Sequence, residues 1–393
     1  MPFRISLGQV AAKETDGRMK IKTIHALAAL VLMISFLFFT TPASLAQNTF
    51  SSYTLVNQED GNYSYTLNVD VPPFLNEYYA GLSHRSYTDN DFPKFVTPYS
   101  VQPIANTLRQ IYPEDEDFTN GILSIVHQIP YEETAEQFYP VETLIRNKGD
   151  CDMFSLLAAS IMIAGGLDVV LLHYSSDQHM NVGVHLAEDP LDARQDIYSI
   201  KKGDAEYYIA ECTGTNWKVG ECPQDLQDAS PVVVSLNNSE QIAPGQVSAS
   251  FKNLTPTTID FSVSSAIVLE GSSVTIEGQL LPAMPDQNVT LYSSASGSDW
   301  TVLATTKTQS EGKFTYLWQS LRMGEIKIRA GWTGNDQFAG TTSQSKTTFF
   351  LPLYLIALSA AVVVTIVLCI VVIAAYGRRP KLQPSESEFV SEV

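Results

Sequence analysis

The chain has 393 residues, of which 45% are hydrophobic and 17% charged, and its net charge is −18. A surface this acidic repels phosphate backbones, so we expect no nucleic acid partner. Four cysteines are too few for a disulfide-stapled scaffold, and no metal-spaced His/Cys/Asp cluster or Gly-rich phosphate loop occurs; we therefore expect no cofactor and no metal.

Residues 1–46 are predicted to be an N-terminal extension and a secretory signal peptide. Basic residues precede an apolar run from Ala26 to Phe39, and small residues lead to Ala46, where cleavage is expected. The run is short for a membrane span of about 20 residues, although an uncleaved anchor is an alternative. Met1 and Met19 are both compatible starts.

Residues 47–235 are predicted to form a first domain with an N-terminal β cover. Polar and apolar residues alternate from Ser51 to Val71, which is the period of half-buried strands. Further along, apolar residues recur at helical spacing from Phe154 to Met162, and Gly165 ends the run. Cys151 therefore lies in the first turn of a predicted helix.

A cysteine at this position is a candidate nucleophile. Unpaired N–H groups and the positive end of the helix dipole favour an anion there, so we expect a lowered pKa for the Cys151 thiol. The alternative is a buried structural thiol, because free cysteine is among the most buried residue types.

The candidate base is His179. The apolar runs at residues 167–174 and 180–186 are typical of buried strands, and His179 opens the second one. His173 and His185 compete with it, but we expect both to be strand or surface histidines. A third predicted strand, at 206–211, ends in Glu211, which could orient the base.

These residues resemble the transglutaminase-like cysteine hydrolases of the papain-related superfamily. The resemblance covers roughly Pro98 to Gly220, and the motifs that carry it are Gly149-Asp150-Cys151, Gly165-Gly166, His179-Met180-Asn181, Glu211-Cys212-Thr213 and the helix-like segment from Ile122 to Tyr131. It implies a Cys151 nucleophile, a His179 base and a Glu211 orienting group. In two places the chain departs from the family pattern, with Asn181 for an aromatic residue and Glu211 for the commoner aspartate.

The resemblance implies a cysteine hydrolase that cleaves or transfers amide bonds in a protein or peptide. The predicted signal peptide, together with an apolar segment near the C-terminus, adds the expectation that this hydrolase is membrane-anchored at the cell surface and acts on an exterior substrate. We prefer hydrolysis to transamidation because no calcium-binding loop is evident. The Cys151 N–H is the expected oxyanion donor, with Gln137 or Tyr139 as a possible side-chain partner. The alternative, which the departures at Asn181 and Glu211 make credible, is a non-catalytic binding or adhesion module of the cell envelope.

Residues 236–258 are polar and rich in turn residues, which predicts a linker. Short strands separated by turns follow in residues 259–348 and favour an immunoglobulin-like β-sandwich. The predicted strands are Ser273–Glu277, Val289–Tyr292, Thr301–Thr306, Lys313–Trp318 and Glu325–Trp332.

Residues 349–376 are long and apolar enough to predict a transmembrane helix that contacts the lipid bilayer. Arg378 and Arg379 in the tail, residues 377–393, indicate a cytoplasmic C-terminus. The expected location is thus the cell membrane, single-pass, with the N-terminal region exterior. Four Asn-x-Ser/Thr triplets agree with an exterior glycoprotein.

Cys212 and Cys222 are predicted to form a small disulfide, and two reduced cysteines are the alternative. The expected fold class as a whole is an α+β transglutaminase-like (papain-like) core, followed by an all-β immunoglobulin-like sandwich and one transmembrane helix.

Overall fold

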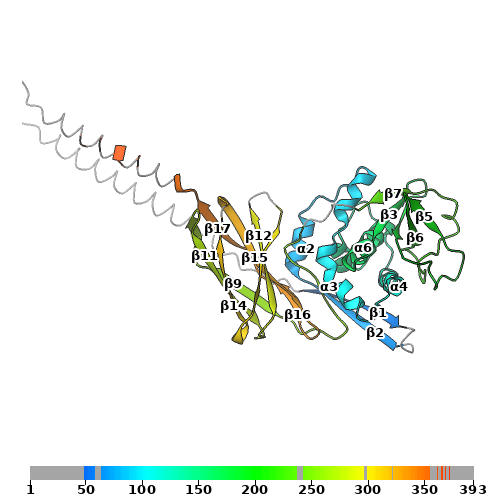
Figure 1. The fold of residues 1–393 in the computed structure, drawn as a ribbon, viewed down its shortest axis with the longest axis horizontal. Coiled ribbons are helices and arrows are strands. Elements are labelled where there is room, and N and C mark those ends of the chain that lie inside the picture. The colour runs from blue at the N-terminus through cyan, green and yellow to red at the C-terminus, as the bar shows by residue number, and fades with distance from the viewer. Residues whose placement is uncertain are drawn as a thin grey trace, which may run out of the picture. The chain divides into compact units, whose positions relative to one another are not determined.

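The computed structural model describes residues 48–57, 63–236, 242–295, 299–320 and 322–354, together with single residues at 361, 364, 365, 368 and 371. The predicted signal peptide (1–46) and tail (377–393) lie outside the described residues. Figure 1 shows the described elements in chain order by colour.

An antiparallel five-stranded sheet with the order β5-β6-β4-β3-β7 carries the candidate site residues. Its strands are β3 (Val169–Tyr174), β4 (His179–Val184), β5 (Ser199–Lys202), β6 (Ala205–Ala210) and β7 (Val232–Ser235). β4 is the middle strand, and its register sets His179 opposite Tyr174 of β3. The strands predicted at residues 167–174, 180–186 and 206–211, which lead to His179 and Glu211, are thus confirmed.

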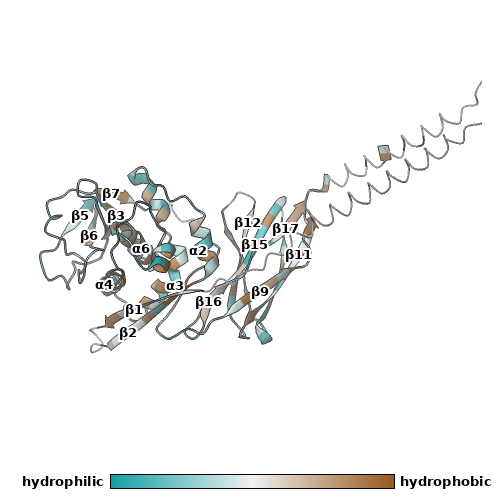
Figure 2. Cartoon of the chain, turned by 180° about the vertical axis from the view of Figure 1, so that it is seen from behind, coloured by the Kyte–Doolittle hydropathy of each residue, from teal (hydrophilic) through white to brown (hydrophobic). Residues whose placement is uncertain are grey.

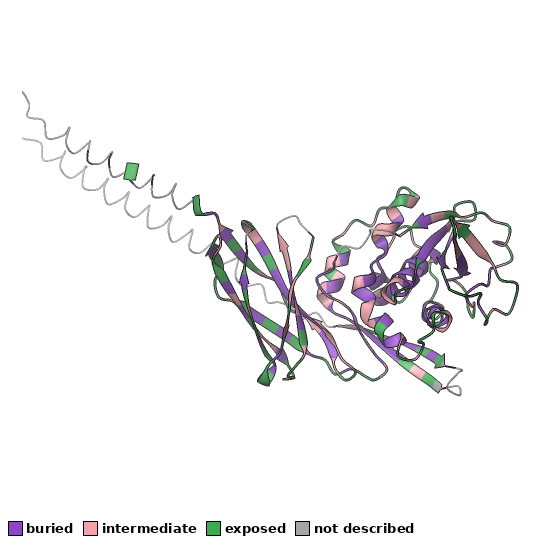
Figure 3. Ribbon diagram, in the orientation of Figure 1, coloured by how far each residue is buried: buried purple, intermediate pink, exposed green. Residues whose placement is uncertain are grey.

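Five α-helices and one 3-10 helix belong to the same part of the chain. They are α2 (Pro73–Ala80), η1 (Asp89–Phe95), α3 (Pro98–Leu108), α4 (Asp115–Val126), α5 (Pro140–Arg146) and α6 (Cys151–Ala164). α6 contacts α3, α4 and α5 as well as β3 and β4. Residues 153–162 are all buried, as Figure 3 shows, because α6 is apolar on nearly every side. The start of this helix is therefore held rigidly.

A three-stranded sheet with the order β1-β2-β8 completes this part. β1 (Thr49–Asn57) and β2 (Tyr63–Val71) pair antiparallel, which confirms the strands predicted from alternation. β8 (Ser248–Ser250) lies inside the predicted linker 236–258, and it pairs with the end of β2. Buried apolar residues of β1 and β2 join the core cluster that contains α6.

Residues 258–351 form two further sheets, with the orders β14-β11-β9 and β10-β17-β15-β12-β13, and β16 pairs with β15. The elements are β9 (Thr258–Val263), β10 (Ile267–Leu269), β11 (Ser273–Leu281), β12 (Asn288–Ala295), β13 (Thr301–Lys307), η2 (Ser310–Gly312), β14 (Lys313–Gln319), β15 (Gly324–Gly334), β16 (Ala339–Thr342) and β17 (Lys346–Leu351). All five predicted strands are confirmed. Figure 2 shows apolar and polar residues interleaved along these strands, and the apolar residues of both sheets meet in one core.

The predicted fold class was wrong. The described residues are 37% strand and 23% helix, so β-structure dominates the described part of the chain. No helix among the described residues has the length and apolar character needed to cross a membrane. This finding also overturns the prediction of a single-pass membrane protein with an exterior N-terminal region and a cytoplasmic tail.

The first residues of the predicted transmembrane helix, 349–351, are part of a strand, and their exposure shows why an apolar run alone predicted a helix here. Phe349, Phe350 and Leu351 complete β17, and they pair with β10 on one side. Phe350 is fully buried in the core between the two sheets, while Phe349 is 43% exposed. Alternating exposure of this kind belongs to a strand, and a count of apolar residues does not detect it. Most of residues 355–376 lie outside the described residues.

Candidate active site

The N-terminus of α6 is fixed by the two residues that precede Cys151. Asp150 is the N-cap, and its Oδ1 accepts a hydrogen bond from the Met153 backbone N–H at 3.3 Å. A Cβ at Gly149 would lie only 3.0 Å from Met153 Cβ and 3.2 Å from Phe154 Cε1. A side chain at this position would therefore require Met153 and Phe154, in the first turn of the helix, to shift by a few tenths of an ångström.

Cys151 is the first residue of α6, and it is 7% exposed. Its Sγ lies 3.6 Å from Asp152 Oδ1 and 3.8 Å from the carbonyl oxygen of Gln178. Gln178 is the last residue of the loop between β3 and β4, with a φ of 49°. The thiol thus lies against the backbone segment that leads directly into His179.

His179 and Glu211 form the best-defined polar pair of the site. His179 Nε2 lies 2.9 Å from Glu211 Oε2, and the carboxyl of Glu211 is completely buried. Glu211 directly follows β6, which pairs with β4, so neighbouring strands hold the two side chains together. A hydrogen bond through Nε2 leaves Nδ1 as the nitrogen available for chemistry.

Further groups hold Glu211 in place. The Thr213 backbone N–H donates to Oε1 at 2.8 Å, and the Thr213 hydroxyl bonds the same oxygen. Asn181 Nδ2 donates to Oε2 at 3.4 Å, so the residue that departs from the family pattern contacts the carboxylate. His127, at the end of α4, bonds the Glu211 carbonyl oxygen at 2.9 Å through Nε2.

No sequence pattern singles out His127. It follows a helix distant in sequence from the cysteine motif, and no spacing connects it to Glu211. Only its position directly after α4, inside the segment that resembles the family's core helix, could have indicated a role.

The charge states follow from burial and neighbours. Burial opposes ionisation of Glu211, but hydrogen bonds from His179 and Thr213 outweigh it and lower the pKa of this carboxyl. Burial also opposes ionisation of His179, which by itself would lower the pKa of this imidazole. The hydrogen bond and the charge of the Glu211 carboxylate outweigh burial and raise the pKa of His179. The site therefore contains an ionised Glu211 that makes His179 a stronger base.

The expected low pKa of Cys151 is not found. Burial, together with the neighbouring carboxylates of Asp152 and Asp150, raises the pKa of this thiol to about 12. These effects outweigh the helix dipole, which contributes at most about 2 kcal/mol at a helix end. Cys151 is thus a neutral thiol at rest.

The remaining candidates are separated by their contacts. His173 Nδ1 bonds Asp89 Oδ1 at 2.6 Å, and His185 Nδ1 bonds the Glu206 carbonyl oxygen at 2.8 Å. Neither bonds Glu211, which leaves His179 as the candidate base.

The two candidate oxyanion partners also differ. Gln137 Nε2 donates to Asp152 Oδ2 at 2.6 Å, so this side chain lies beside the residue that follows the nucleophile. The Tyr139 hydroxyl donates instead to the Ser83 carbonyl oxygen at 3.2 Å. Only Gln137 is therefore positioned near Cys151.

The predicted disulfide was wrong: Cys212 and Cys222 are both free and buried. Burial and the Glu211 carboxylate raise the pKa of Cys222 to about 11. Cys212 bonds the Ala210 carbonyl oxygen at 3.4 Å, as expected of a packed structural thiol. Cys151 is thus one of three free thiols in the described part of the chain, so being free does not distinguish it.

Comparison with known proteins gives little further information. No family model and no curated protein matches this chain. A chitin binding domain from Burkholderia pseudomallei is 13% identical over 22% of this chain and 57% of its own, with a TM-score of 0.19. Spo0M, a sporulation control protein from Bacillus subtilis, is 8% identical over 25% of this chain and 50% of its own, also with a TM-score of 0.19. TM-scores this low carry no argument about fold or function.

Proposed function

We propose that the chain is a transglutaminase-like cysteine hydrolase that acts on amide bonds in proteins or peptides. The observation that carries the proposal is the 2.9 Å contact between His179 and the buried Glu211, next to the backbone that packs on Cys151 Sγ. A buried carboxylate that orients an imidazole, on a strand whose preceding backbone contacts a thiol at a helix start, is consistent with nucleophilic acyl transfer.

In the proposed reaction, Cys151 Sγ attacks the amide carbon while its proton passes to His179 Nδ1. The carbonyl electron pair moves to oxygen, where the Cys151 backbone N–H stabilises it. When the carbon–nitrogen bond breaks, His179 gives the proton to the leaving amine. Water then releases the acyl group from sulfur. Glu211 keeps the proton-accepting tautomer in place throughout.

Energetics define what Glu211 must contribute. The thiol pKa of about 12 lies several units above that of an ordinary imidazole, near 6.5, and each unit adds about 1.4 kcal/mol to the proton transfer. Glu211 raises the pKa of His179 and so narrows this gap. The expected result is a slow enzyme whose rate depends on His179 acting as a base in the attack step.

The test is an assay of the full chain against a mixture of peptides, analysed by mass spectrometry with and without an added primary amine. New carboxyl termini would show hydrolysis, and amine adducts would show transamidation. Cys151→Ala should abolish both products, whereas the matched variant Cys222→Ala should retain them. Product formation by Cys151→Ala at the wild-type rate would exclude the proposal.

The second candidate is a non-catalytic binding module with the same fold, and the raised pKa of Cys151 favours it. Alkylation by iodoacetamide separates the two candidates. A catalytic Cys151 should react in the folded chain faster than Cys212, and His179→Ala should slow it. A Cys151 that reacts only in denaturant, in a chain without activity, would support the binding module.

A further inference from the structure

A polar cavity of about 380 Å³ is lined by residues of α3, of the segment around β8 and of the loop between β15 and β16. Thr107 Oγ1 of α3 donates to the Ala249 carbonyl oxygen of β8 at 3.2 Å. Ser250 Oγ, also of β8, donates to the Asp336 carbonyl oxygen in the loop at 3.2 Å. These hydrogen bonds join the three walls. Ligand cavities measure roughly 300–1,000 Å³, so this one has room for a small ligand.

The charges in the lining neutralise each other. Among the described residues that line the cavity, the only charged ones are Lys252 and Asp336, and Lys252 Nζ lies 2.7 Å from Asp336 Oδ2. A charged ligand would meet an opposite charge and a like charge side by side, so it gains little net attraction. The cavity is therefore suited to a neutral ligand, although the chain as a whole has a net charge of −18.

Two neighbouring amides of α3 supply one free acceptor and one free donor. Gln102 Nε2 donates to the Ala164 carbonyl oxygen at 2.6 Å and to Asn106 Oδ1 at 3.0 Å. A carbonyl oxygen accepts only from the nitrogen end of an amide, so these contacts fix which end is which. Gln102 Oε1 and Asn106 Nδ2 remain without a partner in the part of the chain that the structure describes.

The facing walls supply a second acceptor and a second donor. Gln246 Nε2 donates to the Tyr99 carbonyl oxygen at 2.8 Å, which leaves Gln246 Oε1 free. Asn335 Oδ1 accepts from the backbone N–H groups of Gln337 and Phe338, both at 2.9 Å. Backbone N–H groups select the oxygen end of this amide, so Asn335 Nδ2 is the free donor.

The four free amide ends are open to a ligand. Asn106 is an exposed residue, and in Gln102, Gln246 and Asn335 the free atom keeps solvent-accessible surface. Each amide is held at its other end by the protein, so little conformational freedom is lost when a ligand binds. Phe251 adds a half-buried aromatic ring to the lining, and it packs at 5.4 Å, centre to centre, on the Tyr65 ring.

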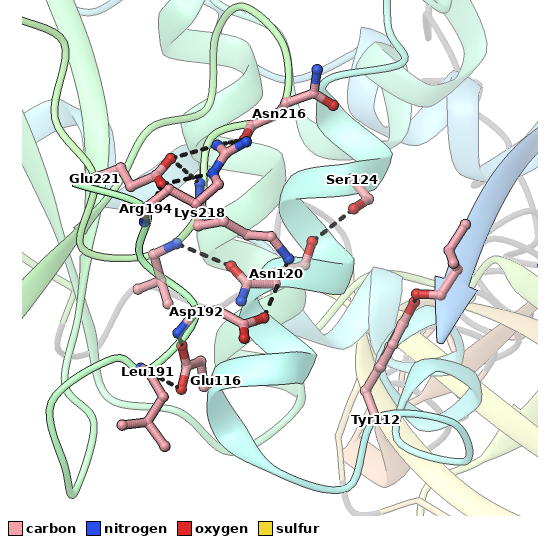
Figure 4. Close-up of polar contacts among 12 residues, drawn as sticks. Tyr112, Glu116, Asn120, Ser124, Leu191, Asp192, Arg194, Asn216, Lys218 and Glu221 are labelled. Atoms are coloured by element: carbon pink, nitrogen blue, oxygen red, sulfur yellow. Dashed lines mark hydrogen bonds and ion pairs between the residues drawn. The ribbon is translucent and has the colours of Figure 1, made fainter. Parts of the chain in front are cut away.

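The cavity of about 580 Å³ beside α4 lacks such open groups (Figure 4). Its Arg194 donates to Glu221 at 2.7 Å. Its Lys218 Nζ lies 3.4 Å from Asp192 Oδ2. Asn120 Nδ2 has no partner among the described residues, but it is buried away from solvent. Paired cations and a buried donor do not favour ligand binding there.

We propose that the cavity between α3, β8 and the β15–β16 loop binds a neutral saccharide of one or two rings. A sugar hydroxyl both donates and accepts, so it can bond either kind of free amide end. The C–H face of a sugar ring can pack on the Phe251 ring. The proposal does not depend on Cys151 chemistry, because no candidate active-site residue lines this cavity.

The experiment uses saturation-transfer difference NMR on the full chain at pH 7. Maltose, cellobiose and lactose are the neutral probes, glucuronic acid and glucosamine are the charged ones, and triglycine amide is the peptide probe. At least one neutral disaccharide should bind with a dissociation constant of about 1–10 mM, and added salt should not weaken it.

Asn335→Asp is the decisive variant because it keeps the acceptor for Gln337 and Phe338 and replaces the free donor with a carboxylate oxygen. It should weaken disaccharide binding about fivefold, as the loss of one neutral hydrogen bond predicts. Asn106→Asp on exposed α3 should have a similar effect, and it decides the question if Asn335→Asp melts early. Asn288→Asp, at the exposed start of β12, is the matched control and should bind normally.

Several results would overturn the proposal. They are no binding of any neutral disaccharide, tighter binding of a charged sugar or of triglycine amide, and wild-type affinity in both Asn335→Asp and Asn106→Asp. Cys151→Ala should bind the disaccharide normally, and loss of binding in that variant would place the sugar at the candidate active site instead. A chain that binds the disaccharide but cleaves no peptide would refute only the proposed hydrolase.

Discussion

Two regions of the molecule differ in how they bury charge. Among the described residues, residues 48–250 bury four carboxylates, those of Asp70, Glu142, Glu211 and Glu221, whereas residues 257–351 bury none. Burying a carboxylate is costly unless it is paired and hydrogen-bonded. The first region therefore contains groups that packing alone does not explain, and the candidate active site lies there.

The partners of these carboxylates are specific. Glu142 bonds His84 at 2.8 Å, Glu211 bonds His179 and Glu221 bonds Arg194. In the second region the buried charge is Arg329, whose guanidinium lies 4.3 Å from the Phe74 ring centre and 5.2 Å from that of Trp300. Burial lowers the pKa of Arg329 to about 10. Aromatic faces therefore stabilise the charge of the second region, and this difference can be tested variant by variant.

The largest expected effect concerns two histidine–carboxylate pairs of the first region. If His179 is the base, His179→Ala should reduce activity roughly a thousandfold, within the usual range for a general base. His173→Ala, which breaks the pair with Asp89, should change activity less than twofold. Comparable losses in the two variants would mean that His179 has no special role.

The next effect is on stability and uses Glu221. Its carboxylate is 2% exposed, accepts from Arg194 and also accepts from the Lys218 backbone N–H at 3.0 Å. Glu221→Ala should lower the free energy of unfolding by about 3 kcal/mol because several donors lose their partner. Urea unfolding followed by tryptophan fluorescence measures this. Glu311→Ala, which breaks an exposed pair with Lys313, is the control and should change stability by less than about 0.5 kcal/mol.

Local features of the candidate site could be predicted from the sequence. The Gly149 to Cys151 motif and the apolar period after it located the start of α6, and the strand pattern located His179 and Glu211. These are short-range signals, because capping and periodicity depend on residues a few positions apart. No such short-range signal marks His127, since its contact with Glu211 joins residues 84 apart in the chain.

Two of the wrong predictions, the low pKa of Cys151 and the helix at residues 349–351, failed because burial and long-range pairing decide both. The thiol pKa was expected to be low because the helix dipole is visible in sequence, whereas the burial of Cys151 and its distance to Asp152 are not. Phe349 to Leu351 were expected to be helical, but pairing with β10 and β15 makes them a strand. Propensity and apolar length are weak predictors wherever tertiary pairing decides the structure.

Asp70 gives a smaller effect, and it depends on pH. Its Oδ2 accepts from Asn48 Nδ2 at 2.6 Å and from the Ser248 hydroxyl at 3.5 Å, but burial outweighs both and raises the pKa of this carboxyl to about 7. A raised pKa means that the folded state binds the proton of Asp70 more tightly than the unfolded state does. The contribution of Asp70 to the free energy of unfolding is therefore greatest below pH 4 and falls as the pH rises to 7. Asp70→Asn should therefore stabilise the chain by about 2 kcal/mol at pH 8 and by less at pH 5.

Thermal or urea unfolding at the two pH values checks this prediction, with Asp204→Asn in an exposed turn as the control. A stabilisation by Asp70→Asn that is equal at pH 5 and pH 8 would show that burial does not raise the pKa of Asp70 in the folded state.

The smallest expected effect tests what the Glu211 carboxylate does for His179. Glu211 raises the pKa of His179 against the opposing effect of burial, so kcat/KM should rise with pH through a value above 6.5 as the imidazole loses its proton. Glu211→Gln can still accept from Thr213 but carries no charge, so the rise should move to lower pH and the plateau should fall. Titration of the His179 ring protons by NMR measures the same change in the pKa of His179 without any substrate. Glu142→Gln, which removes the charge of the carboxylate beside His84, is the control. An unmoved His179 titration in Glu211→Gln would show that this buried carboxylate serves packing alone.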